Sequence, residues 1–163
     1  MEKVTLWLMD EFDVIVIGAG ASGLLAAGRA GELGARVLVL EKMRQEGRKL
    51  LITGKGRCNI TNDATISEFV RHVYPNGRFL KKAFSRFYSK DILQLLKDHG
   101  VETVLERGGR YFPESNKSAD VLNALLKWVK SYNVEIKCGF RVEKIFQEQG
   151  EVTGLKTNGI IYK

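Results

Sequence analysis

Three glycines stand at positions 18, 20 and 23, directly after the hydrophobic run 12–17. This Gly-x-Gly-x-x-Gly spacing allows a tight turn and lets a pyrophosphate come close to the backbone. The alanine- and leucine-rich segment that follows predicts a helix, whose free N–H groups and dipole would face that anion. We therefore expect the turn to bind the diphosphate of a dinucleotide through Gly18, Ala19, Gly20, Ala21, Ser22 and Gly23.

Glu41 completes this fingerprint, 23 residues after Gly18 and at the end of another hydrophobic run, 35–40. An acid at the end of this strand can accept hydrogen bonds from ribose hydroxyls, and its charge would repel a 2′-phosphate. The pattern favours the ADP half of FAD or NAD over NADP. A long glycine- and cation-rich segment follows Glu41 where an NAD domain commonly continues into another strand–helix unit, so we favour FAD.

Residues 54–62, GKGRCNITN, form a second candidate binding element. A run so rich in glycine, cations and amides fits neither a core strand nor an amphipathic helix. Its cations can bind phosphate or flavin oxygens, and its Asn and Thr side chains can bond the flavin or cap the next turn. In and just before this loop we expect cofactor contacts from Lys42, Arg48, Lys49, Gly56, Arg57, Cys58, Asn59, Thr61 and Asn62.

The two cysteines, Cys58 and Cys138, are far apart in the sequence and form no C-x-x-C pair. Arg57 beside Cys58 favours a lowered thiol pKa, and a buried structural thiol is the alternative. His72 and His99 lack companions at metal-ligand spacing, so no metal site is predicted. The residue types and spacings do not identify a catalytic residue.

The hydrophobic pattern predicts an α/β chain built on a Rossmann-like, FAD-binding parallel sheet with a helical and β-hairpin insertion. Strands are expected at 12–17, 35–40 and 133–138, a hairpin at 102–112, a helix at 118–132 and a meander at 141–162. Phe84, Phe87 and Tyr88 have helical spacing and are expected in the core. The expected domains are 1–63 (first part of the FAD-binding domain with the cofactor loop), 64–130 (insertion) and 131–163 (third sheet strand and β-meander).

The net charge of +7 favours an anionic partner. A second basic group, Arg71, Arg78, Lys81, Lys82, Arg86 and Lys90, is interpreted as a solvated face. Basic runs that are broken by glycine and lack exposed, spaced aromatics argue against nucleic acid. The first twelve residues lack a signal-peptide cleavage site, and no apolar run could span a bilayer. We expect a cytoplasmic protein with a small-molecule substrate and no nucleic-acid or membrane partner.

Three segments together resemble the bacterial FAD-dependent oxidoreductases of the BaiN or aminoacetone-oxidase-like family: VIVIGAGASGLLAA, LEKMRQEGRKLLITGKGRCNITN and GGRYFPESNKSADVLNAL. The resemblance covers 12–163 and matches only the N-terminal part of such proteins, so we expect a C-terminally truncated fragment. It implies an FAD-binding oxidoreductase reduced by NAD(P)H, with the backbone of Val142 meeting the adenine. The alternatives are an NAD-binding protein without flavin and a basic nucleic-acid-binding module.

The segment 109–115, GRYFPES, allows two interpretations. Arg110, Tyr111 and Phe112 either line the substrate side of the flavin or anchor the hairpin to a neighbouring helix.

Overall fold

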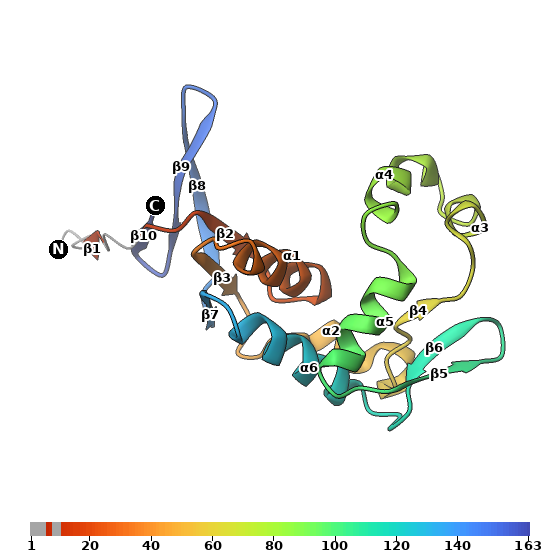
Figure 1. The fold of residues 1–163 in the computed structure, drawn as a ribbon. Helices are drawn as coiled ribbons and strands as arrows, with labels where there is room; N and C mark the ends of the chain where they lie inside the picture. The colour runs from red at the N-terminus through yellow and green to blue at the C-terminus, as the bar shows by residue number, and fades with distance from the viewer. Residues whose placement is uncertain (1–5, 8–10) are drawn as a thin grey trace. The chain divides into compact units, whose positions relative to one another are not determined.

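The computed structural model describes residues 6–7 and 11–163, so much of the segment considered for a signal peptide lies outside the described residues. The chain divides into two compact units, one made of 1–48 with 126–163 and the other of 49–125. No helix among the described residues is long and apolar enough to cross a bilayer. Figure 1 labels the elements of both units.

The first unit contains a parallel sheet in the order β2 (Val14–Ile17), β3 (Val37–Glu41) and β7 (Val134–Cys138). Helix α1 (Ala21–Glu32) connects β2 to β3. The side chains of β3 from Val37 to Leu40 are at most 1% exposed, as expected for a central strand covered on both faces. The three strands and the helix confirm the predicted α/β architecture.

Helix α1 packs closely because its buried face carries glycine. A Cβ on Gly28 would lie 2.2 Å from the ring of Trp128, near the end of α6 (Ser118–Lys130). A Cβ on Gly31 would lie 2.7 Å from Cγ2 of Val134 in β7. The small residues of the sequence thus set how near the helix approaches its neighbours.

A second sheet in the same unit has the order β1 (Leu6–Trp7), β10 (Ile160–Tyr162), β9 (Glu151–Thr157) and β8 (Val142–Glu148). Strands β8 to β10 form the predicted antiparallel meander, while the parallel pairing of β1 with β10 was not predicted. Leu38 and Leu40 of β3 share a buried cluster with Leu155 and Tyr162. This cluster joins the meander to the parallel sheet.

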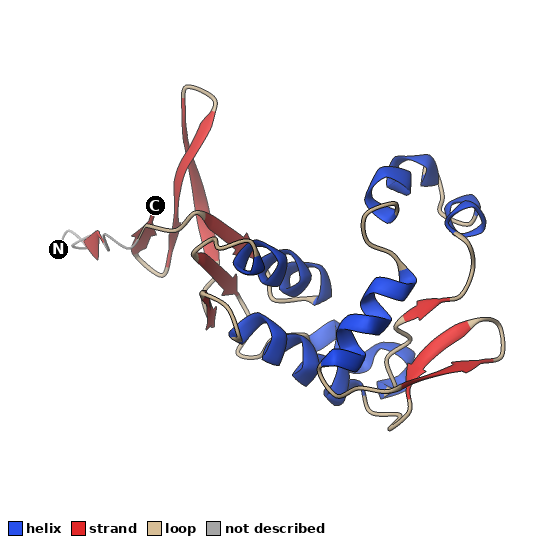
Figure 2. Cartoon of the chain, viewed as in Figure 1, coloured by secondary structure: helices blue, strands red, loops and turns tan. Residues whose placement is uncertain are grey.

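The second unit is mainly helical, with one small antiparallel sheet (Figure 2). The sheet order is β4 (Thr61–Asn62), β6 (Arg110–Pro113) and β5 (Thr103–Glu106), in which β5 and β6 are the predicted hairpin. The helical elements that begin in or near this unit are α2 (Arg48–Ile52), η1 (Thr53–Gly56), α3 (Ile66–Arg71), η2 (Gly77–Leu80), α4 (Lys81–Phe84), α5 (Ser89–Asp98) and α6.

The predicted aromatic stripe in this unit is wrong in part. The helix is interrupted between α4 and α5, where Tyr88 has extended backbone and donates its N–H to Asp91 Oδ2 at 2.7 Å. Phe84 and Tyr88 still pack together and against Phe69, with ring centroids 5.2–5.9 Å apart. Phe87 is 41% exposed, because the interruption removes it from that face.

We predict that Gly28→Ala lowers the free energy of unfolding by about 1–3 kcal/mol, because the added methyl overlaps the Trp128 ring and outweighs the better helix propensity of alanine. Urea unfolding measures the change. Ala26→Ser, on the exposed side of α1, is the control and should stay within about 0.5 kcal/mol of the wild type. Equal stability of Gly28→Ala and wild type would contradict the packing described.

Candidate cofactor site

Each of the three fingerprint positions is occupied by glycine for a different structural reason. Gly18 has φ +102°, which side chains rarely adopt. Gly23 allows the helix to approach the turn, since a Cβ there would lie 1.9 Å from the Gly18 carbonyl oxygen. Gly20 has φ −82°, and a Cβ there would meet no protein atom within 4 Å. The backbone angle therefore explains Gly18 and close packing explains Gly23, while neither explains Gly20, which has open space beside it.

The N-terminus of α1 has the features of an anion site. Gly20 is the N-cap and provides no side-chain cap, and the first turn contains no acid. Ala21 and Ser22 are exposed. The first N–H groups of a helix lack intrahelical acceptors, so a phosphate here would supply the acceptors and meet the positive end of the dipole.

Glu41 connects this turn to the chain that follows β3. Its Oε2 accepts a hydrogen bond from the Ala19 N–H and its Oε1 accepts one from the Met43 N–H, both at 2.9 Å. Sequence reasoning predicted the carboxylate at this end of the strand but not these backbone partners. Each oxygen keeps a second lone pair, so the same carboxylate can still accept from a ribose hydroxyl.

The segment after β7 lies beside the segment after β3. The Gly139 N–H donates to the Met43 carbonyl at 2.8 Å, and the Phe140 N–H donates to the Glu41 carbonyl at 2.9 Å. Val142 follows at the start of β8 and packs on the cluster that contains Leu38. In this unit the structure thus brings the start of β8 near the end of β3, and the side chains of Lys42 and Arg48 are exposed.

In the second unit, Arg57 is held by protein partners that its position in the loop did not predict. Its guanidinium forms a two-point ion pair with Glu106, in which Nη1 lies 3.3 Å from Oε2, and its Nε donates to Asn116 Oδ1 at 2.7 Å. The same group lies 4.2 Å from the centroid of the Phe112 ring. Arg57 therefore anchors the loop to the hairpin.

Cys58 lies in a backbone segment that turns tightly, where Gly54, Lys55, Gly56 and Cys58 itself all have φ between +57° and +84°. The thiol is buried, and burial raises the pKa of Cys58 to about 11 because the thiolate loses solvation. The expectation that Arg57 lowers this pKa is wrong, since the guanidinium is paired with Glu106. The structure supports the alternative of a buried structural thiol.

The end of the loop bonds to the protein itself. Asn62 accepts from the Ala64 N–H at 2.9 Å and donates to the Gly108 carbonyl at 3.0 Å. Thr61 Oγ1 lies 2.7 Å from Ser89 Oγ. This is the capping arrangement that the sequence left open, within a strand, β4, that was not predicted. Lys49 and Asn59 are exposed and Gly56 is half-buried.

Of the hairpin residues 110–113, Phe112 best fits the interpretation that this segment anchors the hairpin. Its side chain is 4% exposed and lies beneath the guanidinium of Arg57. Arg110 is exposed, and its guanidinium lies 5.7 Å from the same ring. Tyr111 is half-buried and pairs with Thr61 in the sheet.

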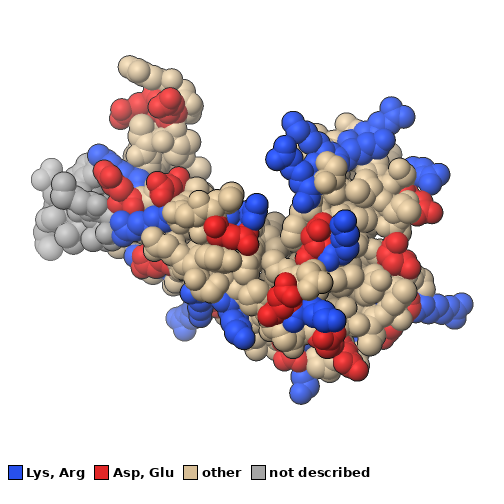
Figure 3. Space-filling view, viewed as in Figure 1, with Lys and Arg blue, Asp and Glu red and all other residues tan. Residues whose placement is uncertain are grey.

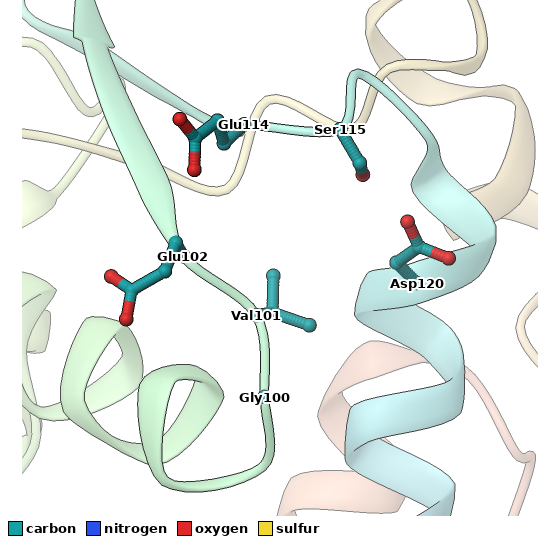
Figure 4. A pocket seen from close by; sticks show the side chains of 6 residues that line it. All are labelled: Gly100, Val101, Glu102, Glu114, Ser115 and Asp120. Carbon is teal, nitrogen blue, oxygen red and sulfur yellow. The ribbon is translucent and has the colours of Figure 1, made fainter.

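An open cavity of about 380 Å³ lies elsewhere in this unit, lined by Gly100, Val101, Glu102, Glu114, Ser115 and Asp120 (Figure 4). Its three carboxylates do not suit a phosphate. Within the part of the chain that the structure describes, no cluster of three His, Cys, Asp or Glu residues could hold a metal ion.

With this geometry established, comparison with known proteins decides the family. The model of the family described as "HI0933-like protein Rossmann domain" matches residues 12–162. The chain belongs to this family. Membership confirms the flavoprotein group predicted from the sequence motifs and the Rossmann-like α/β fold.

Two relatives of the HI0933-like chain exceed 30% identity. The Escherichia coli K12 protein named "Ribosomal RNA dihydrouridine synthase" is 32% identical over 152 residues, 93% of this chain and 37% of that protein. The Clostridium scindens protein named "3-dehydro-bile acid delta(4,6)-reductase" is 35% identical over 132 residues, 80% of this chain and 32% of that protein. The chain spans about a third of the length of these relatives.

Among solved structures, the 3-ketosteroid-delta4-(5alpha)-dehydrogenase of Rhodococcus jostii RHA1 matches with a TM-score of 0.65 and 18% identity. The match covers 98% of the HI0933-like chain and 45% of the dehydrogenase chain. At this identity the likeness shows the fold alone.

We predict that Glu41→Gln lowers the free energy of unfolding by about 1–3 kcal/mol. A glutamine keeps one acceptor oxygen and turns an NH2 group toward a backbone N–H of Ala19 or Met43. Urea unfolding measures the loss, and Glu151→Gln, at an exposed position, should match the wild type. A stable Glu41→Gln variant would show that these hydrogen bonds are dispensable.

The pKa of about 11 predicts how Cys58 reacts with iodoacetamide in a Cys138→Ser variant, where it is the remaining thiol. At pH 8 the folded protein should react about 100-fold more slowly than the denatured chain, and its rate should rise until about pH 11. A rate that levels off below pH 9 would contradict the burial effect.

The same shift makes stability depend on pH. Below pH 9 the thiol is protonated in both states, while above it the unfolded chain ionises first, because its thiol keeps a pKa near the ordinary value of 9.0. The contribution of Cys58 to the free energy of unfolding should therefore fall from pH 9 to pH 11.

Proposed function

We propose that this HI0933-like chain is the FAD-binding part of a flavin-dependent oxidoreductase whose flavin is reduced by NAD(P)H. The observation that carries the proposal is the open space beside Gly20, at a helix N-terminus that no side chain caps. A diphosphate fits this space because it needs both close backbone approach and free N–H donors.

The contacts predicted from the sequence are part of this proposal. The turn 18–23 binds the diphosphate, Glu41 accepts from the ribose, and the backbone of Val142 meets the adenine. We assign the flavin side to the segment 48–62, in which Arg48 and Lys49 offer exposed cations. Arg57, Cys58, Thr61 and Asn62 border the cofactor in this proposal, while their protein contacts hold the segment in shape.

The bound flavin would accept and deliver a hydride, and the protein would supply position and electrostatics. The names of the two relatives above 30% identity, a reductase and a dihydrouridine synthase, support an enzyme of this kind. The bile-acid name supports the predicted small-molecule substrate, whereas the ribosomal-RNA name argues against excluding nucleic acid. The two free thiols support the proposed cytoplasmic location.

Gly20→Val tests the diphosphate site. The valine meets no protein atom within 4 Å of its Cβ, so the unfolding curve should match the wild type, while FAD affinity should fall at least about tenfold because the side chain fills the ligand space. FAD titration followed by flavin absorbance measures binding. Ala26→Val, on the exposed side of the same helix, is the matched control and should bind FAD as the wild type does.

Undiminished FAD binding by Gly20→Val would overturn the site. A wild-type chain that prefers NAD to FAD in calorimetry would favour the NAD-binding alternative. Anaerobic bleaching of bound FAD by NADH or NADPH tests the electron donor separately, and absence of bleaching with both would overturn that part alone.

A further inference from the structure

The segment from Phe69 to Lys90 contains six Lys or Arg residues and neither Asp nor Glu. It includes the end of α3, all of η2 and α4, and the start of α5. All six cationic side chains are exposed: Arg71, Arg78, Lys81, Lys82, Arg86 and Lys90. Figure 3 shows Lys and Arg atoms gathered over α4, at the upper right of the view. We call this region the basic-aromatic surface.

Arg71 Nε donates to the Ser67 carbonyl at 3.2 Å. The other five cationic side chains form no ion pair or hydrogen bond among the described residues and are available to an external anion. The ion pairs found among the described residues lie elsewhere, at Arg29, Arg57, Lys97 and Lys137. The nearest acid before the segment, Glu68, accepts hydrogen bonds from the N–H and hydroxyl of Thr65, which caps α3. Internal pairing therefore does not explain the concentration of positive charge.

Aromatic rings are exposed on the same segment. Tyr74 is 94% exposed, Phe79 82% and Phe87 41%, and these are the aromatics among the large exposed hydrophobic residues of the described chain. The core of the segment is already made by Phe69, Phe84 and Tyr88. The expectation that exposed, spaced aromatics are lacking, which argued against nucleic acid, is thus wrong.

The surface rests on a close-packed framework. A Cβ on the buried Gly77 would lie 1.9 Å from the carbonyl oxygen of Val70, so η2 packs directly on the end of α3. This contact fixes the backbone on both sides of the loop that carries Tyr74.

We propose that the basic-aromatic surface binds single-stranded RNA. Its cations would contact phosphates, and Tyr74, Phe79 and Phe87 would stack on unpaired bases. Two further exposed side chains among the cations can hydrogen-bond a 2′-hydroxyl: Asn76, and His72 through Nε2, since its Nδ1 lies 2.9 Å from the Glu68 carbonyl oxygen. The proposal that this surface binds RNA does not depend on the flavin. The proposal that RNA is also the substrate class rests on the proposed oxidoreductase function.

An anionic membrane fits the same surface less well. Interfacial binding uses a helix with a continuous apolar face. Here α3 has six residues and α4 has four, and their large apolar residues Phe69 and Phe84 pack on each other. The exposed rings are separated along the chain, which suits successive bases better than a lipid interface.

The charge arm of the test uses the full chain and a fluorescein-labelled, 20-nucleotide single-stranded RNA of mixed sequence, followed by anisotropy at several salt concentrations. Lys81→Glu/Lys82→Glu should weaken binding at least about tenfold and reduce the salt slope of log affinity by about 1.4, since each phosphate contact contributes ~0.7. Lys117→Glu/Lys127→Glu makes the same charge change at exposed positions outside the surface and should change affinity less than about twofold. Equal loss in both double variants would overturn the proposed location.

The stacking arm uses Phe79→Ala and Tyr74→Ala. Each should weaken RNA binding about tenfold while leaving the binding of heparin, an anionic polymer without bases, unchanged. Unchanged RNA affinity, tighter binding of the matching DNA, or binding to phosphatidylserine vesicles in place of RNA would each overturn the proposal. FAD titration of the same variants should match the wild type, so failure of RNA binding and failure of the flavin site are read separately.

Discussion

The two hydrogen bonds that Glu41 accepts connect the parts of the first unit on which the dinucleotide site depends. One fixes the fingerprint turn through Ala19, and the other fixes the chain after β3 through Met43. A carboxylate accepts such bonds more strongly than a neutral group does. The acid that sequence patterns associate with ribose therefore also shapes the turn that would receive the diphosphate.

The glycines of α1 and its N-cap fall into two groups, those required by packing and one that leaves space for a ligand. Gly23, Gly28 and Gly31 bring α1 close to its neighbours, because each added methyl would overlap protein atoms. Gly20 follows another rule, since no protein atom approaches the place of its missing side chain. A glycine that neither packing nor a positive φ requires leaves space that a ligand can fill. This open space at Gly20 is what supports a nucleotide at the turn.

The second unit combines two chemically different surfaces. Its loop residues Arg57, Thr61 and Asn62 are bonded to the protein, so their side chains serve mainly to hold the loop in shape. The basic-aromatic surface has the opposite character: apart from Arg71, which donates to the Ser67 carbonyl, its cations have no partner among the described residues, and its exposed rings lie outside a small aromatic core. Groups that lack internal partners are the ones available for recognition.

The sequence by itself determined the strand–helix–strand unit, the hairpin, the meander and the family, because these follow from local periodicity and from glycine and acid spacing. Only the tertiary structure decided that Arg57 pairs with Glu106, that Cys58 is buried, and that Phe79 faces outward. It also decided that β4 joins the hairpin and that β1 pairs with β10. These outcomes depend on contacts between residues far apart in the chain, which compete with local preference and which periodicity does not encode.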